Sequence, residues 1–380
     1  MSLDLNLTES EEMLKATALD FMKRDAPKEV IQRLQETDTG ITGELWRRVV
    51  EMGWLGIIIP EQYGGTGNQL TSAGVLFEAI GTGPLPGPYF SSGILGSLIV
   101  LEAGTEEQKQ QFLPDIAEGK KILTLALTEP DYSWDPGLIQ TAAAAKNGDF
   151  ILDGLKLFIM DAQAATHFIV VARTGKESDT AKGISLFLVD KESEGISVNR
   201  LPGFLTGRSF EVKFDSVKVP AAAMLGSKNM GWPLLQKSIE KAIPVLCAYK
   251  VGGSQAVFEM ALEYSRIRVQ FGIPIGRFQR VQDMIINMVT HLDAARWATY
   301  EALWKLDTQR PAAESIHLAK VLSSQAYWEL CTIGHQVFSG VSYSKEHALS
   351  FHTRASRSLY NFLGEPTYHR QQITKLLAAV

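Results

Sequence analysis

The chain has 380 residues, of which 45% are apolar and 21% charged, and its net charge is −5. This length exceeds what a single hydrophobic core usually supports, so we expect more than one domain. The negative charge and the lack of any Lys/Arg run argue against a nucleic-acid-binding surface. No window reaches the ~20 apolar residues of a membrane helix, so we expect no membrane partner.

The cysteines and histidines argue against a disulfide-rich secreted protein and against a metal-binding protein. Cys247 and Cys331 lie alone in apolar stretches, without CxxC spacing. Two such cysteines cannot build a disulfide framework, and the acidic start of the chain lacks the apolar run of a signal peptide. We therefore expect a cytoplasmic protein. The histidines show no HxxxH or HExxH spacing, so no metal site is predicted.

Residues 1–119 are predicted to form a helical domain. Thr8 and Glu11 form a capping box, and Thr42 is placed to cap a second helix. Further helices are predicted over 73–80 and 95–101, and a short one follows Gly104.

The pattern changes near Lys121, and residues 120–224 are predicted to form a β domain. Asn147-Gly148 lies between two strand-like runs and predicts a hairpin. Asp153-Gly154 has the composition of a second turn. Apolar or alternating runs predict strands over 168–171, 184–189 and 210–214. We expect a small sandwich or barrel.

The helical period returns over residues 225–380. Long helices are predicted over 257–268, 281–306 and 316–337, with Pro244 and Gly252-Gly253 interrupting the region before them. Their apolar stripes favour a four-helix bundle. The expected fold class is therefore α+β: an N-terminal helical domain, a central β domain and a C-terminal helical bundle.

This order and several strings resemble the acyl-CoA dehydrogenase family over nearly the whole chain. Each string alone is short, but six occur in the family's order and at similar spacing. They are Gly53–Gly65, Gly104–Lys109, Thr128-Glu129-Pro130, Gly154–Ile159, Arg268–Gln279 and Gln336–Gly340.

The resemblance implies FAD as cofactor, an acyl-CoA thioester as substrate and an electron-transferring flavoprotein as redox partner. It places Thr128, Trp134, Phe158 and Met160 near the flavin. Residues of a neighbouring subunit would reach the diphosphate and adenosine, so it also implies a dimer or tetramer with itself or a homologous chain. By position these residues are Arg268, Phe271, Gln279, Gln336 and Gly340.

The catalytic base is where the chain departs from the family. The residue before Gly364 is often the glutamate that takes the α proton, but here it is Leu363. Leu363 keeps the backbone N–H that would hold the thioester oxygen, beside Gly364, yet it cannot accept a proton. In some relatives the base lies on an earlier helix, at the position of Ala242. Glu365, or less directly Glu240, is the candidate substitute.

Other departures surround the predicted flavin site. Trp134 replaces a serine that often contacts FAD, Met160 replaces a threonine near the flavin, and Ile243 replaces an arginine of the substrate site. The segment from Leu363 to Arg370 resembles small-subunit-like dehydrogenases of bacterial dicarboxylate (pimeloyl-CoA dehydrogenase small subunit), aromatic and steroid-side-chain degradation.

Three hypotheses follow. The chain is an acyl-CoA dehydrogenase, alone or as one chain of a heteromeric enzyme. Alternatively, it is a catalytically silent subunit that completes the FAD site of a partner chain. A third hypothesis is a related flavoprotein oxidase or monooxygenase.

Overall fold

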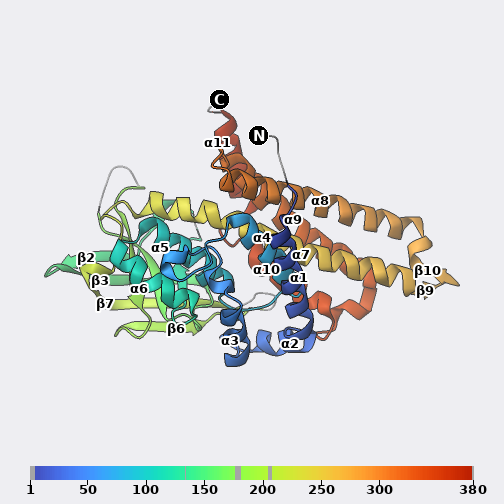
Figure 1. The fold of residues 1–380 in the computed structure, drawn as a ribbon, viewed down its shortest axis with the longest axis horizontal. Helices are drawn as coiled ribbons and strands as arrows, with labels where there is room; N and C mark the ends of the chain where they lie inside the picture. The colour runs from blue at the N-terminus through green and yellow to red at the C-terminus, as the bar shows by residue number, and fades with distance from the viewer. Residues whose placement is uncertain (1–4, 133, 176–180, 204–207, 379–380) are drawn as a thin grey trace.

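The structure is a computed structural model that describes residues 5–132, 134–175, 181–203 and 208–378. A β region lies beside a long helical bundle, and the first helices pack against both (Figure 1). The predicted order of helical, β and helical regions is confirmed. Among the described residues, no helix is long and apolar enough to cross a membrane.

The N-terminal region is helical, as predicted. Both predicted caps are present: Thr8 and Glu11 form a reciprocal capping box, and the Thr42 hydroxyl accepts from the Leu45 N–H. The elements are α1 (Glu9–Arg24), α2 (Lys28–Glu36), α3 (Gly43–Glu51), η1 (Trp54–Gly56), η2 (Glu61–Tyr63), α4 (Leu70–Gly81), the π-helical η3 (Ser91–Gly96), α5 (Ser97–Ala103) and α6 (Glu106–Ala117).

The middle region is one curved sheet in the order β6-β7-β3-β2-β4-β5-β8, with β1 parallel to β4. Its elements are β1 (Leu123–Ala126), η4 (Pro136–Leu138), β2 (Ala142–Lys146), β3 (Asp149–Met160), β4 (His167–Arg173), β5 (Ile184–Asp190), β6 (Ile196–Arg200), β7 (Ser209–Val219), η5 (Ala221–Ala223) and β8 (Met224–Leu225). Phe168 of β4 packs on Phe214 of β7 at a ring separation of 6.2 Å, although these strands are not neighbours. The sheet must therefore curl around its own core.

One hairpin prediction is confirmed and one turn prediction is wrong. Asn147-Gly148 joins β2 to β3, with Asn147 and Gly148 both at positive φ. Asp153-Gly154 lies inside β3, where the pairing with β7 shifts register between Leu152 and Gly154. The glycine accommodates a bulge in a continuous strand, because a side chain there would meet Thr141 at 2.4 Å.

The C-terminal bundle is built on one very long helix. The elements are α7 (Gly231–Ile267), β9 (Val269–Gln270), β10 (Ile273–Pro274), η6 (Ile275–Arg277), α8 (Gln279–Asp307), α9 (Ala313–Phe338), η7 (Ser339–Tyr343), α10 (Ala348–Tyr360) and α11 (Pro366–Ala378). Helices α7, α8 and α9 share a core that includes Val257, Leu292 and Leu330.

The predicted interruption of α7 is wrong. Pro244 lies within the helix, where the surrounding side chains are fully buried. Gly252 and Gly253 allow close packing rather than ending the helix: a Cβ at Gly252 would lie 1.8 Å from the Glu78 carbonyl oxygen, and one at Gly253 would lie 2.4 Å from the Tyr327 ring. Tertiary packing therefore outweighs the local helix-breaking tendency.

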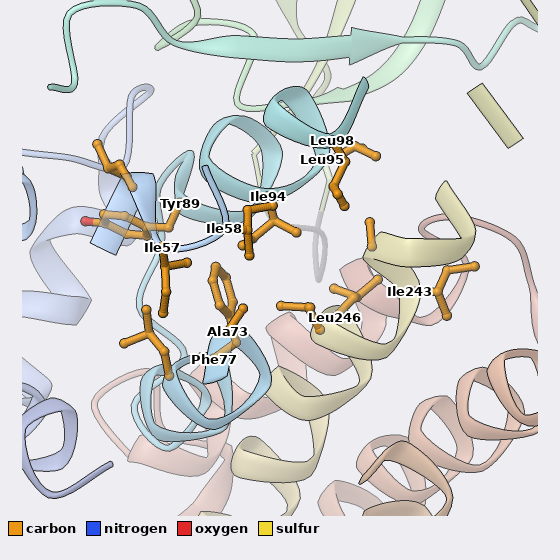
Figure 2. Packing of buried hydrophobic residues seen from close by; sticks show 14 of the residues in the cluster. Ile57, Ile58, Ala73, Phe77, Tyr89, Ile94, Leu95, Leu98, Ile243 and Leu246 are labelled. Atoms are coloured by element: carbon orange, nitrogen blue, oxygen red, sulfur yellow. The ribbon is translucent and has the colours of Figure 1, made fainter. Parts of the chain in front are cut away.

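A single apolar cluster joins the regions. Figure 2 shows Leu246 on the side of α7 toward Phe77 of α4 and Ile94 of the η3 segment, while Ile243 lies on another side of the same helix. These helices form the walls of the cavity described next.

Candidate active site

Leu363 lies buried in a short segment between α10 and α11. Its exposed fraction is 2%, and its φ is +58°, in the left-handed region that a leucine rarely adopts. This conformation costs about 1–2 kcal/mol and persists only where the surroundings hold it.

Two histidines hold the Leu363 carbonyl. His369 Nε2 lies 2.9 Å from the Leu363 oxygen, and His369 Nδ1 lies 2.8 Å from Nδ1 of His317. Because the carbonyl can only accept, His369 donates from Nε2 and accepts at Nδ1, so His317 must donate from its own Nδ1. Burial lowers the pKa of His317 to about 4 and that of His369 to about 3, which keeps both rings neutral near pH 7.

A buried lysine holds the next carbonyl. Lys320 of α9 donates to the Gly364 oxygen at 2.7 Å and to the Tyr360 oxygen at 3.2 Å. Burial lowers the pKa of Lys320 well below its usual range, and the ammonium of Lys250 lowers it further. Gly364 has a φ of +97°, and a side chain there would meet His369 Nε2 at 2.5 Å. The segment therefore requires glycine at this position.

A cavity of about 250 Å³ adjoins this segment. Phe362 and Met160 lie in its wall, and Leu246 of α7 is another lining residue. Ala242 lies one turn before Leu246 and is fully buried in the apolar core. Neither Leu363 nor Ala242 brings a carboxylate to the cavity.

Two pairs of aromatic residues are together called the aromatic face here: Tyr132 with Phe158, and Trp134 with Tyr368. The rings of Tyr132 and Phe158 meet edge to face at 5.3 Å, and those of Trp134 and Tyr368 lie 6.0 Å apart. Phe158 is 45% exposed at a φ of +56°, and Tyr132 is 37% exposed at +53°. Half-exposed rings in strained backbone indicate a binding surface.

Thr128 and Met160 flank Phe158 from its own β region. The Thr128 carbonyl accepts from the Leu157 N–H at 2.9 Å, which ties the predicted Thr-Glu-Pro string to β3. The Thr124 hydroxyl donates to the Met160 carbonyl at 2.7 Å, and the Met160 sulfur lies 3.9 Å from the Ser209 hydroxyl. Thr128 is thus tied to the strand that carries Phe158 and Met160, whereas Trp134 lies against Tyr368 of α11.

A buried ion pair anchors this string and was not anticipated from sequence. Lys156 Nζ lies 2.7 Å from the Glu129 carboxylate and 3.1 Å from the Leu127 carbonyl. Burial lowers the pKa of Lys156 to about 8, although the Glu129 charge opposes the shift. Burial alone would raise the pKa of Glu129, but Lys156 and hydrogen bonds near Thr141 bring it below its usual value. The sequence signal that could have indicated this ion pair is a lysine placed between apolar residues of a strand.

The charges of the two candidate carboxylates act on tyrosines of the aromatic face. Burial raises the pKa of Tyr132, a hydrogen bond with Asn361 lowers it, and the charge of Glu365 raises it again. Burial raises the pKa of Tyr368, and Glu240 adds to that shift. Glu365 itself is exposed and is not among the residues that line the cavity.

The remaining predicted residues lie at the far end of the bundle. This bundle tip comprises Arg268, Phe271, Gln279, Gln336 and Gly340, all of them exposed. The end of α7 packs against the end of α9 here, where the rings of Tyr264 and Phe338 lie 4.5 Å apart at a tilt of 34°. Phe271, on the β9–β10 turn, is 94% exposed. Figure 1 shows this turn at the end of the molecule opposite the sheet.

Comparisons with known proteins agree with this architecture. Three domains of one family match the chain in order: "Acyl-CoA dehydrogenase, N-terminal domain" over residues 8–120, the middle domain over 124–217 and the C-terminal domain over 229–378. "Probable acyl-CoA dehydrogenase YngJ" of Bacillus subtilis is 30% identical, over 98% of each chain. The "Caffeyl-CoA reductase-Etf complex subunit CarC" of Acetobacterium woodii is 29% identical, over 97% of this chain and 98% of its own.

A solved structure shows the same fold. Butyryl-CoA dehydrogenase from Megasphaera elsdenii is 27% identical, with a TM-score of 0.91 over 99% of this chain and all of that one. The order of domains, the shared fold and the domain matches lead to one assignment: this chain belongs to the acyl-CoA dehydrogenase family of FAD-dependent oxidoreductases, which act on CH–CH bonds.

Proposed function

We propose that this chain takes part in the FAD-dependent α,β-dehydrogenation of an acyl-CoA thioester. The observation that carries the proposal is the buried Leu363–Gly364 segment beside the cavity, with both carbonyls fixed by His369 and Lys320. Fixing these carbonyls orients the backbone, so the Leu363 N–H is available to hold a thioester oxygen. FAD, when bound, supplies hydride acceptance.

The residues of the aromatic face fit a planar cofactor ring. Phe158 and Tyr132 present half-exposed rings, Met160 belongs to the same strand as Phe158, and the Thr128 carbonyl is hydrogen-bonded to that strand. Met160 offers a thioether where a hydroxyl donor is common in the family, so it contributes packing rather than a strong hydrogen bond. We propose that these residues and Trp134 contact the flavin.

We propose that two chains share each cofactor. Helix α7 has 37 residues, which is about 55 Å at the α-helical rise, and it separates the bundle tip from the β region. The exposed Arg268 and Phe271 suit a diphosphate and an adenine ring from a second chain. Gln279, Gln336 and Gly340 would complete that contact.

The proton acceptor must come from outside the two usual positions. Glu365 is our first candidate because its charge acts on Tyr132 of the aromatic face, and Glu240 is the second because it acts on Tyr368. The departures at Leu363, Ala242, Trp134 and Met160 support placement in the small-subunit-like branch, whose members often work as one chain of a heteromeric enzyme.

Two further proposals concern the setting of the reaction. The name of the Acetobacterium relative includes an Etf complex, which supports an electron-transferring flavoprotein as redox partner. The two buried free thiols, Cys247 and Cys331, support a reducing, cytoplasmic location.

The test is anaerobic flavin reduction by acyl-CoA thioesters, recorded for the chain alone and with a homologous second chain. We expect bleaching, and we expect Glu365→Gln to slow it by about 10²-fold or more, as loss of a general base does. Glu240→Gln tests the second candidate, and Glu44→Gln on the exposed face of α3 is the matched control. Flavin binding without bleaching in either preparation would favour the silent-subunit alternative.

A further inference from the structure

One end of the cavity carries a polar cluster that the proposed reaction does not use. Ser91, Asp161, Tyr89 and Arg208 all line it, whereas most of the remaining wall is apolar. All four are buried, with exposed fractions of 3%, 5%, 4% and 7%. Buried polar groups beside an apolar cavity are costly unless something satisfies them.

Arg208 is held in place but only partly satisfied. One terminal nitrogen lies 3.5 Å from the Asp161 carboxylate, while Nε has no hydrogen-bond partner among the described residues. The guanidinium packs against Gly40, where an added Cβ would lie 2.2 Å from it. Arg208 is thus wedged at this end of the cavity with an unused donor.

Tyr89 is the second unused group. Its hydroxyl is buried and has no partner among the described residues. Figure 2 shows its oxygen pointing away from Phe77 and Ile94, toward the edge of the apolar cluster. Tyr89 and Arg208 line the same cavity. Burial raises the pKa of Tyr89, the Arg208 charge lowers it and the Asp161 charge raises it.

The balance of groups favours an acceptor with negative charge. Asp161 is already engaged, since its second oxygen accepts from Ser91 at 2.7 Å. The unused groups, Arg208 Nε and the Tyr89 hydroxyl, are both donors. Arg200 and Arg354 also line the cavity, and among the lining residues that the structure describes Asp161 is the one carboxylate. Arg200 is paired with Asp38 at 2.6 Å. Arg208 is buried and keeps an unused donor, so it is the cation best suited to bind a ligand.

We propose that Arg208 and Tyr89 bind a carboxylate carried by the acyl chain, so that the substrate is the mono-CoA thioester of a dicarboxylic acid. This inference rests on the proposed function, because it assigns the acyl chain to this cavity. Phe77, Leu246 and Leu359 provide the apolar wall for the methylenes between the two ends. The carboxylate would satisfy both donors in a site from which water is largely excluded.

The experiment compares equilibrium binding of paired thioesters to the assembled flavoprotein by calorimetry. The mono-CoA thioesters of glutaric, adipic, pimelic and suberic acid are each measured against the monocarboxylic thioester of the same carbon count. We expect at least one pair to favour the carboxylate by about 10-fold or more. Arg208→Gln should abolish the preference. Tyr89→Phe removes a hydroxyl that has no partner in the described part of the chain, so it should fold normally and reduce the preference several-fold.

Controls separate this inference from the proposed function. Both variants should bind the monocarboxylic thioesters within about twofold of the parent chain, and Arg47→Gln, on the exposed side of α3, should change neither series. Binding without preference in every pair, or a preference that survives both substitutions, overturns the inference alone. Selective binding without flavin bleaching overturns the proposed reaction alone. If no thioester binds, both proposals fail.

Discussion

The Leu363–Gly364 segment and the bundle tip differ in how much of their structure comes from this chain. The first is buried, and its carbonyls are held by His369 and Lys320 from two other helices. The bundle tip is exposed: 94% of the Phe271 side chain is accessible to solvent, and a Cβ added at Gly340 would meet no atom within 4 Å. The proposed thioester end of the site is therefore preorganised within one chain, whereas the exposed tip has the character we would expect of a surface that another molecule completes.

The strongest way to test the buried segment is to supply the group that it lacks. Leu363→Glu places a carboxylate at the position where relatives carry their base, in a backbone conformation that the segment already enforces. In the Glu365→Gln background, which removes our first candidate base, we expect Leu363→Glu to accelerate flavin reduction by about 10²–10⁴-fold, the usual contribution of a general base. Stopped-flow absorbance measures the rate.

Leu363→Gln is the matched control, because it has the same shape and cannot accept the proton. Equal rates for the glutamate and glutamine variants would show that the segment does not lie at the reacting carbon.

The second test removes the support behind the segment. Lys320→Met deletes the donor to the Gly364 and Tyr360 carbonyls, which are then left without their charged partner. We expect thioester affinity to fall by about 100-fold, corresponding to ~3 kcal/mol of lost hydrogen bonding. Loss of the repulsion between Lys320 and Lys250 limits the change in unfolding free energy. Calorimetric binding and chemical denaturation separate the two effects.

Lys305→Met is the control for that experiment. Its ammonium bonds Glu301 and Ser315 away from the cavity. If both lysine variants weakened binding equally, the loss would reflect general destabilisation of the bundle.

The third test uses the neutral histidine pair. The pKa of His317 lies at about 4 in the folded chain against 6.5 when unperturbed. Between these values the unfolded chain binds a proton that the folded chain does not, so the free energy of unfolding falls as pH falls. The contribution is fully present above pH 6.5 and is lost toward pH 4, by up to about 1.4 kcal/mol per pH unit.

Urea denaturation across this range measures the slope. His317→Gln can still donate to His369 but does not titrate there, so its slope should be shallower by about that amount. His291→Gln, at an exposed position, should keep the parent slope. A parent-like slope in His317→Gln would contradict the assignment.

Sequence patterns predicted the features that depend on neighbouring residues. The Thr8 capping box and the Asn147-Gly148 hairpin were readable because each is complete within a few positions. The order of regions was readable because the hydrophobic period changes twice along the chain. Pro244 and Asp153-Gly154 misled for the opposite reason: packing of α7 and pairing of β3 with β7 override what the local residues favour.

The residues of the candidate site also fall into those that the sequence indicated and those that it did not. The resemblance indicated Phe158, Met160 and Leu363, and the structure places Met160 in the cavity wall and Leu363 in the segment beside it. The supporting residues were missed because their partners are distant in sequence: Lys320 contacts Gly364 across 44 positions, and Lys156 contacts Glu129 across 27. A buried charge in an apolar run signals that a partner exists but does not identify it.

The smallest effect is expected at the bundle tip, and it tests the other half of the comparison. Arg268→Ala should lower FAD affinity by about 10-fold, the value of one charge-assisted contact, while the unfolding free energy of the chain stays within about 0.5 kcal/mol because the side chain is exposed.

A second variant, Phe158→Asp, disables the aromatic face. In a dimer of two Arg268→Ala chains, or of two Phe158→Asp chains, both FAD sites contain the substituted residue. A mixed dimer pairs the intact face of one chain with the intact tip of the other, so flavin titration of co-refolded chains should recover one tight site per mixed dimer. Mixing two tip variants provides the control and should recover none. If the mixed dimer binds no better than its parents, each chain holds its cofactor with its own tip, and the exposure of Phe271 must have another cause.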